Sequence, residues 1–171
     1  MKILKGLLLS FVLIVLSTPS YAQSLSFKKE VKGNYQSALI TIAKNFRNAQ
    51  KVIQYSDEKT GTIVIRALFD FSPYSDLSSY QSANGIIHYN LTITRKDSST
   101  IIIVIEDFEH DTHKIGDSDG YYSFGKVTTN VDAPKIEASF SSKKWRQKVW
   151  ETIKQSCQSY ADSLFIIFET K

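Results

Sequence analysis

The chain has 171 residues, among them 21 Lys and Arg against 17 Asp and Glu. This length suits one domain built around one hydrophobic core. A charge so close to neutral argues against nucleic acid as a partner, and the single cysteine, Cys157, excludes a disulfide within the chain.

Residues 1–22 have the three parts of a secretory signal peptide in the expected order. Lys2 and Lys5 give a positive start, residues 7–16 form a short apolar core, and Ser20-Tyr21-Ala22 places small residues at the cleavage position. The apolar core is shorter than the roughly 20 residues that span a bilayer as a helix. We therefore expect cleavage near Ala22 and release of residues 23–171 into the periplasm or beyond, with no transmembrane span.

The first part of residues 23–171 predicts a strand followed by a helix. Apolar and polar residues alternate over 25–31, as in a half-buried strand. Asn34 can then cap a helix through its side-chain oxygen. From Tyr35 to Phe46 the apolar residues recur at spacings of three and four, which predicts an amphipathic helix of about three turns.

Two hairpins are predicted next. Residues 52–55 and 63–71 are joined by a turn that ends at Gly61, where a positive φ is tolerated. After a polar loop, residues 87–94 alternate again, and the turn at 96–99 leads into a strand over 100–108. These strands predict an antiparallel sheet with one polar face.

The last third of the chain predicts a loop and a long helix. Residues 109–139 contain four Gly or Pro and few periodic apolar residues, so we expect a flexible loop without essential core. After a cap at Ser141 or Ser142, one apolar stripe runs from Trp145 to Phe168, which predicts a helix of about six or seven turns. The predicted fold class is α+β in the order β-α-β-β-β-β-α, a single domain with both helices packed on one face of a curved sheet.

Several segments resemble an exported bacterial family, the domain of unknown function 4468, which has a TATA-box-binding-protein-like (TBP-like) fold. The similar segments are Phe27-Lys28-Lys29-Glu30-Val31, the helix from Tyr35 to Phe46, Val52-Ile53-Gln54, Gly61-Thr62-Ile63 and His88-Tyr89-Asn90-Leu91-Thr92-Ile93. The resemblance implies a fold and no activity, and it supplies no catalytic residues. It does not imply DNA binding, because a fold alone does not carry a function.

The densest polar cluster lies at residues 106–113, with Asp117 and Asp119 close behind. Carboxylates and imidazoles are ligands for divalent metals, so one hypothesis is a metal-dependent hydrolase that uses residues 106–119. However, His110 and His113 share a face only on a helix, and this segment follows a strand. We favour a solvated segment that protects a sheet edge, and we expect no metal and no cofactor.

Two other features have alternative interpretations. Cys157 lies on the apolar stripe of the last helix, which favours a small core residue over a nucleophile. The basic residues within 143–154 form either a solvated face, with Trp145 in the core and Trp150 at its rim, or a surface for anionic lipid or an acidic partner.

The function favoured by the sequence is a non-enzymatic binding module of the cell envelope, in which a groove between the long helix and the sheet holds an apolar ligand or a peptide. The candidate ligand-binding residues are Phe69, Phe71, Tyr89, Tyr121, Tyr122 and Trp150. The alternative is a structural protein that docks on another envelope protein. A filled interface between helix and sheet would favour that alternative.

Overall fold

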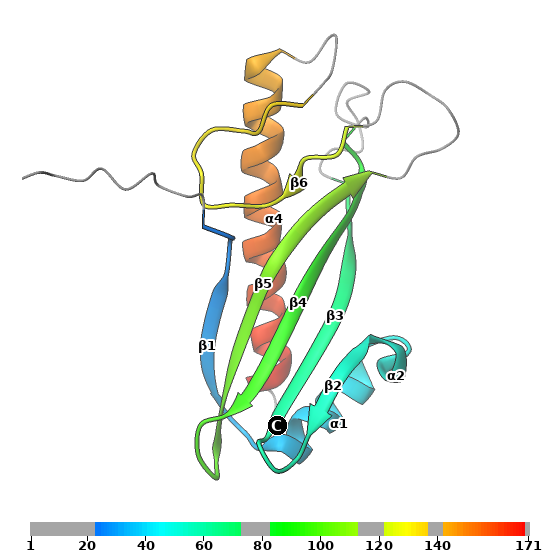
Figure 1. Cartoon of the computed structure of the whole chain (residues 1–171), viewed down its shortest axis with the longest axis vertical. Coiled ribbons are helices and arrows are strands. Elements are labelled where there is room, and N and C mark those ends of the chain that lie inside the picture. The colour runs from blue at the N-terminus through cyan, green and yellow to red at the C-terminus, as the bar shows by residue number, and fades with distance from the viewer. Residues whose placement is uncertain (1–22, 73–82, 113–121, 137–141, 170–171) are drawn as a thin grey trace, which may run out of the picture.

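The computed structural model describes residues 23–72, 83–112, 122–136 and 142–169 (Figure 1). In chain order the elements are β1 (Phe27–Lys32), α1 (Tyr35–Asn45), α2 (Ala49–Val52), β2 (Ile53–Asp57), β3 (Thr62–Phe71), β4 (Gly85–Arg95), β5 (Thr100–Thr112), β6 (Gly125–Lys126) and α4 (Lys143–Glu169). The predicted order of strands and helices is confirmed, with α2 and β6 as short additions.

The strands form one antiparallel sheet of six strands in the order β1-β5-β4-β3-β2, and β6 pairs with the far part of β5. β1 lies at one edge and β2 at the other, so α1 and α2 carry the chain across the sheet (Figure 1). The β2–β3 turn depends on Gly61, whose φ of 65° is the left-handed conformation that glycine adopts without strain. The β4–β5 turn is held by the Asp97 carboxylate, which accepts a bond from the Ser99 amide at 2.8 Å.

β2 covers only part of its neighbour. Its pairing with β3 begins where Ile53 lies opposite Ile65, whereas β4 follows β3 to Gly85 opposite Phe71. In the described residues, no strand lies on the outer side of β3 beyond Ile65. We call residues 66–71 of β3 the open edge.

Both helices pack on one face of the sheet, as predicted. In Figure 1 α4 runs behind the sheet along its length, and α1 lies across the end near the β2–β3 turn. α1 begins with a capping box: the Ser37 amide donates to Asn34 Oδ1 at 2.9 Å, and the Asn34 amide donates to Ser37 Oγ at 2.8 Å. α1 then buries Tyr35, Ala38 and Ile42.

The core between helices and sheet has two chemically different ends. The aliphatic end lies at the two hairpin turns and contains Ile63, Ile65, Leu91, Ile93, Ile101, Ile103 and Ile105. The aromatic end lies where β3 ends and β4 begins, and it contains Phe71, Tyr89, Phe108, Phe124 and Trp150.

A β-bulge separates the two ends on β5. His88 of β4 pairs with Glu109, but Asn90 pairs with Glu106, so β5 carries one extra residue there. Asp107 takes the left-handed conformation with φ 55°. Strict alternation after Ile105 would turn Asp107 and Glu109 into the core, and the extra residue turns Phe108 and His110 inward instead.

The prediction that residues 109–139 contain no essential core is wrong. β5 continues to Thr112, β6 lies within the segment, and Phe124 and Val127 are 4% and 0% exposed. The bulge explains the error, because it interrupts the alternation from which the strand was predicted. Residues 113–121 and 137–139 of this segment lie outside the described residues.

No helix in the described part of the chain combines the length and the hydrophobicity that crossing a membrane requires.

Candidate functional site

Three of the candidate ligand-binding aromatics belong to the core. Trp150 and Tyr89 are each 1% exposed and Phe71 is 2% exposed. The Tyr89 hydroxyl lies 3.3 Å from that of Tyr160, and burial together with this bond raises the pKa of Tyr89. In the described residues, the space between α4 and the sheet at Phe71 and Trp150 is filled by protein, while Tyr89 also lines a groove beside β3.

The other three candidates occupy different places. Phe69 is half-buried, and its ring stacks on Tyr160 with centroids 4.0 Å apart. Tyr122 is half-buried and meets the edge of the Trp145 ring at 6.0 Å. Tyr121 lies outside the described residues.

The expected positions of the two tryptophans are reversed. Trp150 is the core residue: it stacks on Phe124, and its indole N–H donates to the Asn130 carbonyl at 3.1 Å. Trp145 is only partly buried. Lys154 on the predicted basic face also donates to the Asn130 carbonyl, at 3.0 Å, so this lysine fastens the 122–136 segment to α4.

The acidic and His cluster is divided between the two faces of β5. His110 is fully buried, whereas Glu109 and Asp111 on either side of it are exposed. No three metal-ligating side chains converge within the described residues. His113, Asp117 and Asp119 lie outside them.

His110 acts as a neutral link inside the aromatic end. Its Nδ1 accepts a bond from the Phe124 amide at 3.1 Å, and its Nε2 lies 2.9 Å from the Ala83 carbonyl, which only accepts. Nε2 therefore carries the proton. Burial lowers the pKa of His110, while the Ala83 bond and the nearby Asp111 oppose that shift. The sequence had placed this residue in a loop.

Cys157 is fully buried on α4, as expected. Burial raises the pKa of its thiol to about 12. The thiol is therefore protonated at neutral pH and is a poor nucleophile.

An edge groove of about 430 Å³ lies beside the open edge of β3. Its apolar lining comes from the end of α1, α2, β3 and α4, through Phe46, Val52, Leu68 and Tyr160. Leu68 is 49% exposed. Arg47 and Arg66 add two positive charges to the lining. This groove was not predicted from the sequence, although the predicted strand 52–55 is much shorter than its partner 63–71, which was a signal for an unpaired length of β3.

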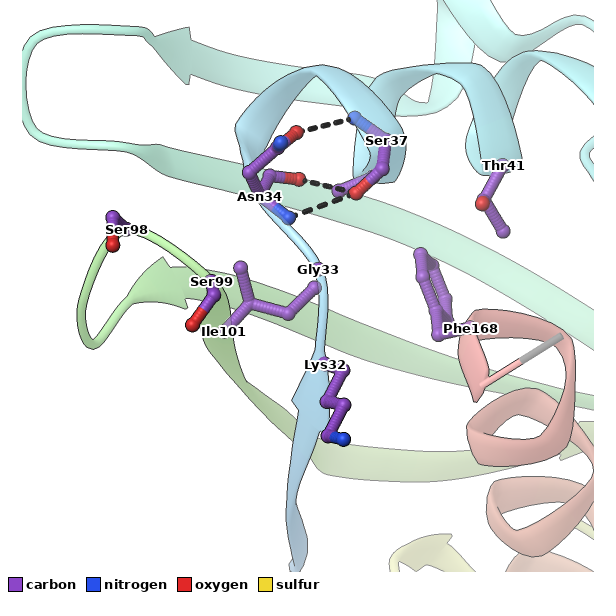
Figure 2. A pocket seen from close by; sticks show the side chains of 10 residues that line it. Lys32, Gly33, Asn34, Ser37, Thr41, Ser98, Ser99, Ile101 and Phe168 are labelled. Carbon is purple, nitrogen blue, oxygen red and sulfur yellow. Dashed lines mark hydrogen bonds between the residues drawn. The ribbon is translucent and has the colours of Figure 1, made fainter. Parts of the chain in front are cut away.

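A second hollow, of about 350 Å³, lies between the β1–α1 corner, the β4–β5 turn and the end of α4 (Figure 2). Figure 2 shows Asn34 and Ser37 joined by the bonds of the capping box and Phe168 reaching from α4 toward α1. The polar groups of Asn34 and Ser37 in this hollow are thus already engaged in capping α1.

A third hollow, of about 240 Å³, lies over the bulge on the uncovered face, which is the face of the sheet without helices. Asn90 donates to Asp107 there at 3.0 Å, beside Arg66, Glu109 and Lys126. Both acidic and basic side chains line it, so it selects no ligand charge. The edge groove remains the best candidate site.

The fold defined by these elements is that of the TBP-like α+β proteins. Residues 28–110 match the family model of a domain of unknown function, DUF4468, with TBP-like fold. The chain is thus similar to this family over residues 28–110, and the resemblance in the sequence is confirmed.

Two solved structures are similar. One is a TBP-like protein from Parabacteroides distasonis, with 14% identity and a TM-score of 0.51 over 86% of this chain and 94% of that chain. The other is a DUF4468 family protein from Bacteroides ovatus, with 18% identity and a TM-score of 0.46 over 92% and 93% of the two chains. No curated protein matches the sequence. At such low identity, the first similarity shows the fold alone.

Proposed function

We propose that this protein is an exported, non-enzymatic binding module of the cell envelope that docks a partner at the edge groove. The edge groove carries this proposal, because it places an exposed Leu68 beside an unpaired length of β3. Proteins usually shield such edges, since a bare strand edge recruits other chains. An edge left bare beside apolar surface is typical of an interaction site.

The filled interior supports docking on the surface over enclosure of a ligand. Tyr89 and Trp150 occupy the space in which the sequence placed an apolar ligand. A filled interface was the condition that favours the docking alternative.

The hydrolase alternative has less support. A general base and a metal ligand must converge on one substrate, but His110 faces the core while Glu109 and Asp111 face outward. His110 has both ring nitrogens engaged in hydrogen bonds.

Export is part of this proposal and rests on the signal-peptide pattern of residues 1–22. Mass spectrometry of the periplasmic fraction of the producing cell should find a chain that begins within a residue or two of Gln23. A chain that keeps Met1 in the cytoplasm would contradict export.

Site-specific photocrosslinking tests the docking surface. A photoreactive amino acid at Leu68 should give a discrete adduct with an envelope protein in living cells. The matched control is Ile40, which is 55% exposed on α1 and lies outside the edge groove. Equal labelling at both positions, or none at Leu68, would contradict the proposal.

A further inference from the structure

We propose that the open edge binds an extended peptide of the partner as an added β-strand, and that this peptide carries an acidic residue beside an apolar one. This inference rests on the proposed function and names the class of partner. Hydrogen bonding, shape and charge at the open edge each support it.

Some backbone N–H and C=O groups of the open edge point away from β4, to the side where no described strand lies. The Arg95 amide donates to the Gly61 carbonyl at 3.1 Å, so Gly61 and Arg95 form a hydrogen-bonded pair across β3 and β4. Bonded pairs alternate along an antiparallel ladder, and the β3–β4 register is regular to Phe71. The N–H and C=O groups of Leu68 and Asp70 therefore point away from β4, where no described strand receives them.

The edge groove fits the side chains of an added strand. Successive side chains of that strand would point to opposite faces of the sheet. On one face they would lie beside Leu68, and on the other beside Phe46 and Val52. The six residues of the open edge extend over about 20 Å, which is enough to pair with a peptide of about six residues.

The charges of the edge groove select an acidic peptide. Its charged lining residues, Arg47 and Arg66, are exposed, and neither forms an ion pair within the described part of the chain. An Asp or Glu near them gains a charge-assisted bond. Farther along the open edge, Asp70 would repel a second acidic residue, so the acidic residue of the peptide should lie near Arg66.

A second copy of this chain fits the open edge less well than a short peptide. If two copies paired antiparallel around Leu68, Ile65 of one would lie opposite Phe71 of the other. Ile53 already pairs with Ile65 on that side of β3, so β2 of each copy would collide with β3 of the other copy. A short peptide avoids this collision.

The test begins with selection of a randomised eight-residue peptide library on the purified protein. Selected peptides should combine apolar residues with Asp or Glu, and N-methylation of alternate peptide amides should weaken binding about tenfold or more, with little effect at the intervening amides. Free protein should exchange the amide hydrogens of Leu68 and Asp70 quickly, and bound peptide should slow both. Fast exchange in the bound state, or protection already present in the free protein, would overturn strand addition.

Substitutions separate the two components of binding. Asp70→Pro removes an outward N–H at an edge position where proline is tolerated, and should weaken peptide binding about tenfold, whereas Asp70→Asn keeps the N–H and binds normally. Arg66→Glu should weaken binding of acidic peptides similarly, while Lys28→Glu on β1 should not. Circular dichroism checks that each variant is folded.

The outcomes distinguish this inference from the proposed function. A partner crosslinked at Leu68, together with peptides insensitive to alternate N-methylation and to Asp70→Pro, would overturn strand addition alone. No crosslink and no selected peptide would overturn both. A dimer in the free protein that Asp70→Pro dissociates would identify a second copy as the occupant and overturn the peptide.

Discussion

The aliphatic and aromatic ends of the core follow different rules of construction. At the aliphatic end, regular alternation places isoleucines such as Ile63, Ile93 and Ile103 inside, and their shape alone fills the space. At the aromatic end, alternation is broken by the bulge at Asp107, and large rings pack around a buried His110. Because the aromatic end depends on particular hydrogen bonds and one special backbone conformation, single substitutions there should have distinctive effects.

The largest effect is expected at Trp150. Trp150→Ala removes a fully buried ring and its bond to Asn130, and should lower the free energy of unfolding by about 3–5 kcal/mol. The matched control, Trp145→Ala, removes a partly exposed ring and should cost less. Urea unfolding followed by circular dichroism measures both. A larger loss of unfolding free energy for Trp145→Ala than for Trp150→Ala would contradict the assignment of Trp150 as the core residue.

The bulge gives the next largest effect. Asp107→Val should lower the free energy of unfolding by about 1–3 kcal/mol, because a β-branched side chain is strained at positive φ. Asp107→Gly relieves the backbone and loses the Asn90 bond, so it should be close to neutral. Equal unfolding midpoints in urea for the two variants would contradict a bulge at this position.

The aliphatic end could be predicted from the sequence, and much of the aromatic end could not. Periodicity located β3, β4 and the first part of β5, because apolar residues alternate there without interruption. After Ile105 the apolar positions change parity to Phe108, a change that a bulge explains but alternation alone does not. The change was visible in the sequence, and it could have extended the predicted strand.

The tryptophans were assigned wrongly for a geometrical reason. The predicted stripe advanced in steps of four from Trp145, but a helix turns every 3.6 residues, so Trp145 lies about 120° around α4 from Cys157. Trp150 lies seven residues before Cys157 and only about 20° away. The edge groove was missed for a different reason, since its lining combines the end of α1, α2, β3 and α4, which only tertiary packing brings together.

His110 should make the aromatic end sensitive to acid. Its folded pKa is lowered, so between that value and its ordinary 6.5 the unfolded chain binds a proton that the folded chain does not. Stability should therefore fall as the pH decreases from 7.5 to 5.5, by at most about 1.4 kcal/mol. His110→Gln should lose this pH dependence, whereas His88→Gln, on the uncovered face, should keep it. A dependence that survives His110→Gln would have to come from other groups.

The smallest effect is expected at Cys157, which lies on α4 between the two ends. Cys157→Ala removes one sulfur atom from the core and should cost about 1 kcal/mol or less. Its thiol also reports how α4 opens, because a disulfide reagent at pH 8 reaches it only when the helix leaves the sheet. If that opening is global unfolding, Trp150→Ala should accelerate labelling by the full factor calculated from its loss of stability, about tenfold for each 1.4 kcal/mol. A smaller acceleration would mean that α4 opens around Cys157 while Trp150 stays packed in the aromatic end, and the two ends would then be independent units.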